Sequence, residues 1–185
     1  MLYLETPRLI LRDYVESDFE AYYRLKSDPS VMYYLQDIRL FDEESGWEDF
    51  QRVLEDRQNP DRTFYFLHME TKDSLAQVGS IGYTVTDRTP LGKHVHAGYF
   101  TYPRFWGNGY VTEAFRRVLE YAFTQDGVAL VTTGCLAENR GSERVMQKCG
   151  LIKERELPNH ERHDGKLKTR LEYQLFKSEY MKQVH

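Results

Sequence analysis

The chain has 185 residues, of which 41% are hydrophobic and 29% charged, and its formal net charge is −4. A chain of this length can bury a core without a metal or a disulfide, so we expect one domain over residues 1–185. The negative charge and the lack of a basic stripe argue against nucleic-acid binding. Without a membrane-length apolar run or a signal-peptide pattern, we expect no membrane association and a cytoplasmic location.

Cysteine spacing and local charge give two further expectations. Cys135 and Cys149 match no metal-ligand or CxxC spacing and lie among apolar residues, so we expect buried structural thiols and no metal site. Between Asp37 and Asp56, eight acidic residues occur with only two arginines. That segment is either a solvated helix face or a surface that attracts cationic substrates.

The first third of the chain predicts one strand followed by two helices. Residues Leu9–Asp13 read as a strand, and Ser17 with Glu20 forms a capping-box pattern that opens a helix through about Lys26. Residues 31–35 form a short apolar connection. Apolar residues at helical spacing then predict a second helix, which ends before Asn59: Trp47, Phe50, Val53 and Leu54.

The rest of the chain predicts a sheet that is interrupted by helices. Three strands separated by polar loops suggest an antiparallel meander: Thr63–Met69, Val78–Thr86 and Val95–Tyr102. The elements expected after them are a helix to about Thr124, a strand at Val128–Leu136, a helix at Asn139–Lys148, two strands at Ile152–Leu157 and Lys168–Phe176 around a polar turn at Asn159–Gly165, and a helix from about Lys177. This order predicts an α/β (α+β) fold whose mixed, mostly antiparallel sheet has about seven strands, with helices on both faces.

The most informative stretch runs from Arg104 to Tyr110 and has glycines at alternate positions, Gly107 and Gly109. It follows a predicted strand and opens a predicted helix. Glycine lets the backbone bend and come close to a ligand. The first N–H groups of the helix, with the positive end of its dipole, point toward the turn. We interpret the stretch as a site for a phosphate or pyrophosphate.

Several motifs resemble those of one family. Arg104-x-x-Gly107-x-Gly109, between a strand and a helix, resembles the acetyl-CoA-binding motif of the GNAT acetyltransferase superfamily. The turn lacks a Walker ending and the three-glycine dinucleotide pattern. Four strings are similar to the RimJ/RimL-like branch, the ribosomal-protein N-terminal acetyltransferases: residues 105–115, 138–145, 148–151 and 6–12. The resemblance covers essentially the whole chain and implies a GNAT-like fold and an acyltransferase that uses acetyl-CoA.

The resemblance also implies which residues contact acetyl-CoA. Backbone N–H groups of the glycine turn would bind the pyrophosphate, Arg104 would add charge-assisted hydrogen bonds, and the preceding strand would pair with the pantetheine arm. The implied contacts are Phe100, Thr101, Tyr102, Arg104, Phe105, Trp106, Gly107, Asn108, Gly109 and Tyr110, with Asn139 and Ser142 at the thioester end. Three further cations would either reach phosphates or form a solvated helix face: Arg140, Arg144 and Lys148.

Acetyl transfer needs a neutral amine, a donor for the oxyanion and a proton for the leaving thiolate. Many relatives carry Glu where this chain has His96, and an imidazole with a pKa of about 6.5 suits a general base. The alternative for His96 is a partly exposed strand histidine. Ser142 matches a serine that the branch places near the thiolate and would donate the proton. The alternative for Ser142 is a helix cap, a role that Asn139 can also fill.

The basicity of the acceptor amine decides how strong a base the enzyme needs. An α-amine has a pKa of about 8, whereas deprotonating a lysine near neutral pH costs about 4 kcal/mol. An α-amine can therefore react with the help of a weak base. The resemblance to the RimJ/RimL-like branch implies direct attack by a protein or peptide N-terminal α-amine in a ternary complex. The alternatives are a polyamine or another small amine, and a non-catalytic acyl-CoA-binding sensor.

Two tyrosines, Tyr33 and Tyr34, are the expected substrate-binding residues, because they lie in the connection that covers the cleft in this fold. Core packing is the alternative for both. The expected partners are an amine acceptor and, in a homodimer, a second copy of the chain. A monomer is equally compatible with the resemblance.

Overall fold

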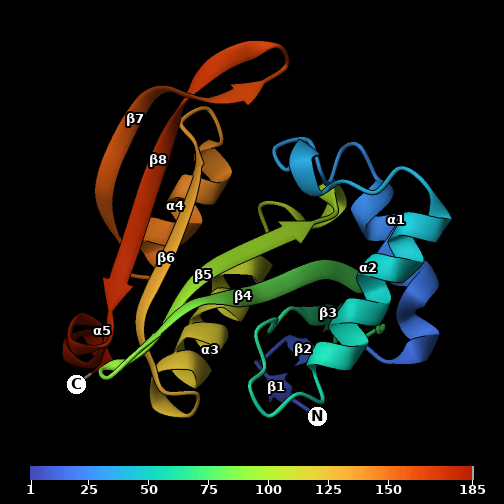
Figure 1. Cartoon of the computed structure of the whole chain (residues 1–185), viewed down its shortest axis with the longest axis horizontal. Coiled ribbons are helices and arrows are strands. Elements are labelled where there is room, and N and C mark those ends of the chain that lie inside the picture. Colours follow the sequence, from blue (N-terminus) through green and yellow to red (C-terminus); the bar gives the residue numbers. More distant parts are fainter. Residues whose placement is uncertain (185) are drawn as a thin grey trace. The chain divides into compact units, whose positions relative to one another are not determined.

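The structure, a computed structural model, describes residues 1–184 (Figure 1). The chain divides into two units. Unit 1 comprises Met1–Thr84 and Gly98–Val118, and unit 2 comprises Val85–Ala97 and Leu119–His185. Two strands and one helix run through both units: β4 (Gln77–Thr89), β5 (Gly92–Thr101) and α3 (Tyr110–Thr124).

The fold is the mixed α/β arrangement that the sequence predicts. Hydrogen-bonded strands follow the order β1-β2-β3-β4-β5-β6-β8-β7. The remaining strands are β1 (Tyr3–Glu5), β2 (Leu9–Arg12), β3 (Leu67–Thr71), β6 (Val128–Leu136), β7 (Ile152–His163) and β8 (Lys166–Phe176). The remaining α-helices are α1 (Phe19–Ser27), α2 (Glu43–Asp56), α4 (Arg140–Lys148) and α5 (Lys177–Val184).

The described residues form eight strands rather than about seven. The additional strand, β1, has only three residues, too few to show a period, and it is recruited by antiparallel pairing with β2. Strand β3 begins at Leu67, four residues later than Thr63 suggests, since Phe64 makes only an isolated bridge to Thr84. The predicted order of the other elements is confirmed.

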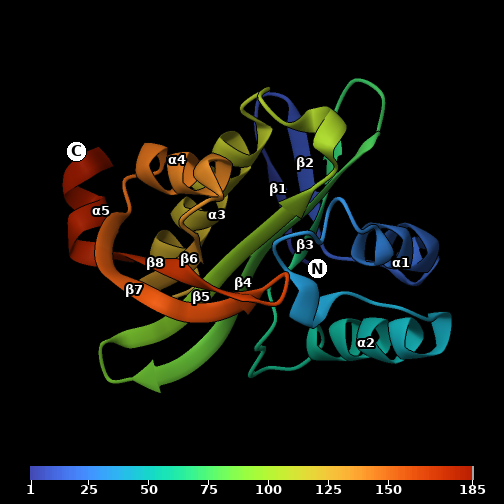
Figure 2. The same ribbon diagram turned by 90° about the horizontal axis from the view of Figure 1, so that it is seen from above.

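Unit 1 packs helices α1 and α2 beside each other (Figure 2). Their contact is an aromatic cluster in which Tyr14, Tyr22 and Phe50 are buried. The predicted capping box at Ser17 is wrong. A 3-10 turn at Glu16–Asp18 precedes α1, and the Asp18 carboxylate instead accepts the N–H of Val15 and pairs with a guanidinium of β2.

Unit 2 contains the parallel ladder of β5 with β6, whose register runs from Lys93–Val128 to His96–Thr132, and the antiparallel pairs β6–β8 and β7–β8. The predicted polar turn at Asn159–Gly165 is wrong. Strand β7 continues to His163 through register shifts, and the turn is confined to Asp164 and Gly165. Both residues of this turn have positive φ.

Both cysteines, Cys135 and Cys149, are buried, as expected, and no disulfide joins them within residues 1–184. None of the helices in that range combines the length and the apolar character that crossing a membrane requires.

Candidate active site

The glycine turn in unit 1 has the backbone conformation that its sequence predicts. Gly107 and Gly109 both lie in the left-handed region, with φ of +76° and +77°. A Cβ on Gly107 would meet nothing within 4 Å, so the backbone there is open to a ligand. The Asn108 side-chain amide donates to the carbonyls of Phe105 and Trp106, at 3.2 Å each, which holds the turn closed.

The turn is attached to the end of β5 through aromatic contacts. Trp106 Nε1 donates to Thr101 Oγ1 at 3.1 Å. The Arg104 guanidinium lies over the ring of Tyr102, 4.6 Å from its centroid, and over that of Phe105, at 5.0 Å. Arg104 is exposed at the rim of the turn, where a phosphate can reach its N–H groups.

Side chains of Phe100 and Tyr102 are buried in a cluster with Leu25, Val31 and Met32. Because these side chains belong to the core, only the backbone at these two positions remains for a cofactor. The same cluster joins the end of β5 to the connection at residues 31–35, against which Leu35 and Phe105 also pack. Tyr33 and Tyr34 lie on that connection with their rings edge to face, 4.8 Å apart. Tyr33 is 44% exposed, so it is not a core residue.

A carboxylate at the start of α3 links the glycine turn to the N-terminal strands. Glu113 accepts hydrogen bonds from Thr6 Oγ1 at 2.6 Å, from the backbone N–H of Arg8 at 2.9 Å and from Arg8 Nε at 2.7 Å. Arg8 Nη1 also donates to the carbonyl of Asn108 at 3.0 Å. The role of this group was not predicted, although residues 6–12 and 105–115 contain all of its members.

In unit 2, His96 is held by Thr132. His96 Nδ1 lies 3.3 Å from Thr132 Oγ1, and that hydroxyl donates its own proton to the carbonyl of Val95 at 3.1 Å. Since a threonine hydroxyl has one proton, Nδ1 must be the donor in the contact with Thr132. This assignment from the hydrogen-bond network leaves the lone pair on Nε2. Burial and the positive charge of Arg170 lower the pKa of His96, against an opposing effect of Glu172. The neutral imidazole is therefore favoured at pH 7.

Ser142 and Asn139 lie at the start of α4. The helix is capped by Asn139, whose Oδ1 accepts the N–H of Ser142 at 3.2 Å, so the Ser142 hydroxyl is not the cap. Burial raises the pKa of the Cys135 thiol to about 11, although a hydrogen bond with the Ser142 side chain opposes this. The Cys135 thiol is therefore protonated at neutral pH, and the Ser142 hydroxyl is its neighbour.

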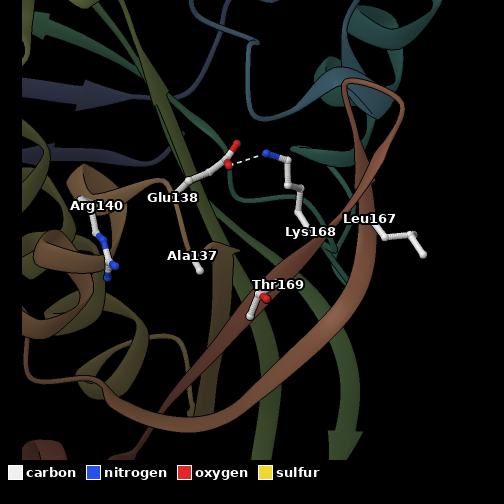
Figure 3. A pocket seen from close by; sticks show the side chains of 6 residues that line it. All are labelled: Ala137, Glu138, Arg140, Leu167, Lys168 and Thr169. Atoms are coloured by element: carbon white, nitrogen blue, oxygen red, sulfur yellow. Dashed lines mark hydrogen bonds and ion pairs between the residues drawn. The ribbon is translucent and has the colours of Figure 1, made fainter.

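The two catalytic candidates adjoin opposite faces of β6. Side chains alternate along a strand, so Thr132, which contacts His96, and Cys135, which neighbours Ser142, point to different faces. Figure 3 shows a pocket of about 360 Å³ at the end of β6, where Glu138 and Lys168 point toward each other and form an ion pair of 2.7 Å. Arg140 lies on the other side and pairs with Glu143, while Arg144 and Lys148 are exposed.

Three carboxylates of the acidic segment between Asp37 and Asp56 make contacts that stabilise the fold. Asp42 caps α2, Asp49 accepts from Tyr22 and pairs with Lys26, and Asp56 accepts the N–H groups of Thr63 and Phe64. Hydrogen bonds from the start of α2 lower the pKa of Asp42. These three carboxylates stabilise the fold of α2 rather than forming an open cationic site.

A family comparison identifies the chemistry of this arrangement. The model of the acetyltransferase (GNAT) domain family matches residues 8–152. The chain belongs to the GNAT acetyltransferase family. It is thus an acyltransferase that moves an acetyl group to an amine.

Individual GNAT relatives agree with the family and differ in their acceptors. An uncharacterised N-acetyltransferase of Bacillus subtilis, YnaD, is 28% identical over 154 residues, which are 83% of this chain and 84% of that protein. The fold matches a ribosomal-protein-S5-alanine acetyltransferase from Vibrio fischeri with a TM-score of 0.82 at 16% identity, covering 97% and 99% of the two chains. It also matches a spermidine N-acetyltransferase from Vibrio cholerae, in complex with CoA and spermine, with a TM-score of 0.80 at 16% identity, covering 94% and 98%.

GNAT acetyltransferases take the acetyl group from acetyl-CoA, and the glycine turn fits this cofactor. Alternating left-handed glycines and the start of a helix form a concave backbone surface that binds anions. Gly107 has open space where a side chain would lie, and Arg104 supplies a positive charge beside it. The turn can therefore hold the pyrophosphate, and the cofactor when bound supplies an activated thioester.

Replacing Gly107 by Ala should weaken acetyl-CoA binding about tenfold, because an exposed turn with Ala at this position relaxes from the left-handed conformation and re-forming it on binding costs roughly 1–2 kcal/mol. Isothermal titration calorimetry measures the change. Gly165→Ala is the matched control, since its φ is +74° and its Cβ would also meet nothing within 4 Å. We expect the control to lose stability but keep its affinity. Equal affinity of Gly107→Ala and the unaltered protein would contradict this role of the turn.

Proposed function

We propose that this protein acetylates a protein or peptide N-terminal α-amine by direct attack in a ternary complex, as a member of the RimJ/RimL-like branch. The observation that carries the proposal is the neutral, half-buried imidazole of His96, with its lone pair on Nε2. An imidazole is a moderate base. It suits an α-amine, which has a pKa of about 8, better than a lysine amine, whose deprotonation near pH 7.4 costs about 4 kcal/mol.

The proposed roles follow the two faces of β6. His96 takes the proton of the amine on the face where Thr132 points and later releases it to solvent. Ser142 donates its hydroxyl proton to the CoA thiolate on the face where Cys135 points as it takes up a proton from water, so the hydroxyl is restored. The amine nitrogen forms a bond to the thioester carbonyl carbon, and the carbon–sulfur bond breaks when the tetrahedral intermediate collapses. A base and an acid on separate faces serve a substrate and a leaving group that depart in different directions.

The proposed cofactor contacts come from the glycine turn, from the end of β5 and from the start of α4. Backbone groups from Phe105 to Tyr110 and the side chain of Arg104 hold the phosphates in unit 1. The backbone at residues 100–102 pairs with the pantetheine arm. Asn139 and Ser142 in unit 2 lie at the thioester end, and the pocket beside Asn139 that contains Glu138 and Lys168 supports a ligand site at this end of β6.

A base with a lowered pKa predicts the pH dependence of turnover. The active form of His96 is the neutral one, so its titration should produce an acidic limb in kcat that lies below pH 6.5, separate from the titration of the acceptor α-amine at about pH 8. His96→Gln should remove this acidic limb and lower kcat on the order of 10²-fold. His94→Gln, on the same strand, should leave both unchanged. If the acidic limb of the kcat profile persists in His96→Gln, a residue other than His96 is the general base.

Ser142→Ala should lower turnover on the order of 10²-fold and change the acetyl-CoA Kd far less, because it removes a proton donor and no phosphate contact. The Asn139 cap accepts the backbone N–H of residue 142 and survives the substitution. Pre-steady-state thiol release and calorimetry separate the two effects. Ser142→Thr keeps a hydroxyl and should recover part of the rate. Parallel loss of turnover and affinity would contradict the donor role.

A second candidate acceptor is a polyamine or another small amine. The carboxylates of α2 that take no part in its capping or packing support this candidate, as does the spermine-bound structure of similar fold. Commitment of Asp42, Asp49 and Asp56 to structural contacts weakens it.

The deciding experiment is thiol release from acetyl-CoA with four acceptor classes: N-terminal peptides, lysine peptides, polyamines and aminoglycosides. We expect turnover with N-terminal peptides and none with the same peptides after N-terminal blocking. Turnover confined to spermidine and spermine would replace the proposal by the polyamine reading. Binding of acetyl-CoA without turnover across the panel would contradict the proposed acceptor and favour a sensor.

A further inference from the structure

Arg170 on β8 is held by two carboxylates from different strands. Its Nη1 donates to Glu161 of β7 at 2.7 Å, and its Nε donates to Glu172 of β8. Burial opposes the charge of the guanidinium, but these two carboxylates raise the pKa of Arg170, so it remains a cation. The three side chains together carry one positive and two negative charges.

The guanidinium of Arg170 occupies the space above a glycine of β6. A Cβ on Gly134 would lie 2.7 Å from Arg170 Nη2 and 2.7 Å from the carbonyl oxygen of Leu171. Gly134 is two residues from Thr132, so that Cβ would point to the face of β6 that carries the Thr132 hydroxyl. The absence of a side chain at position 134 thus places a half-buried positive charge on the same face of β6 as the Thr132 hydroxyl that contacts His96.

We propose that Arg170 is a positioning residue for acetyl transfer, whose guanidinium, seated on Gly134, keeps the neighbouring imidazole of His96 unprotonated. This inference rests on the proposed function, in which His96 is the base. A cation close to an imidazole disfavours the imidazolium, because two like charges repel in a half-buried site. Arg170 acts through His96 and need not touch the substrate.

The groups that face His96 in unit 2 come from three strands. Strand β6 contributes the uncharged hydroxyl of Thr132, β8 contributes Arg170 and Glu172, and β7 contributes Glu161 through its bond to Arg170. Burial and Arg170 lower the pKa of His96, whereas Glu172 raises it. The lowering effects of burial and Arg170 prevail over that of Glu172, and the net charge of −1 of the three side chains means that they do not repel a cationic amine.

The test is an NMR titration of the His96 ring protons in the full chain, with the His96→Gln spectrum to assign the resonance. Arg170→Met should move the titration midpoint to higher pH, since it removes the cation and leaves Glu172 uncompensated. Glu172→Gln should move it to lower pH. Opposite shifts are the expected result, because loosened packing alone would move both midpoints in the same direction. Unchanged midpoints, or shifts of the same sign, would overturn the proposal.

Arg170→Lys is the conservative variant and should keep the midpoint close to that of the unaltered protein. Turnover gives a second readout: Arg170→Met should lose a larger fraction of its kcat at pH 6 than at pH 8. If Arg170→Met does not fold, Arg170→Gln, which removes the charge and keeps hydrogen-bond donors for the two carboxylates, carries the test by a shift of the midpoint to higher pH. The titration needs no acceptor, so it distinguishes failure of this inference from failure of the proposed function.

Discussion

The carboxylate of Glu113 is the interaction on which the geometry of the glycine turn depends. It lies in the first turn of α3 and accepts hydrogen bonds from Thr6 and from two N–H groups of Arg8. Burial opposes ionisation, but these hydrogen bonds prevail and lower the pKa of Glu113. A carboxylate at a helix N-terminus stabilises the helix, yet alone it would repel a phosphate from the same helix end. Arg8 removes that conflict by neutralising the charge.

Besides neutralising Glu113, Arg8 also fixes the orientation of the glycine turn. Its Nη1 holds the carbonyl of Asn108 at 3.0 Å, and its guanidinium lies 4.4 Å from the centroid of the Tyr110 ring. The carbonyl between the two left-handed glycines is therefore turned toward Arg8. The link between the β1–β2 connection and α3 thus orients the turn as well as balancing its charge.

Local patterns predicted the elements whose limits are marked by side chains of strong preference. Strand β6 and helices α3 and α4 end at or within a residue of the predicted positions, since glycines and an Asn cap mark those ends. Prediction was weaker where the structure is set by pairing between strands. The hairpin of β7 and β8 continues through register shifts because β8 offers it a partner, and polar residues such as Asn159 are tolerated on an exposed edge.

In the candidate site too, residues within continuous motifs were predicted, whereas residues brought in by strand pairing were not. The glycine turn, His96 and Ser142 were predicted from motifs that are continuous in the sequence, and the competition between Asn139 and Ser142 for the α4 cap needed one hydrogen bond to resolve. Thr132 and Arg170 were not predicted, because each reaches the site only through the register of β6 with its neighbours. Their contribution depends on alternation along β6.

Because of that alternation, Gly134 and Thr132 lie on the same face of β6. On one face of β6 the hydroxyl of Thr132 fixes the tautomer of His96, and two residues on, the missing side chain admits the Arg170 guanidinium. On the other face, burial keeps the Cys135 thiol protonated beside Ser142. A single strand therefore separates a face that favours an unprotonated base from a face that favours protonated groups.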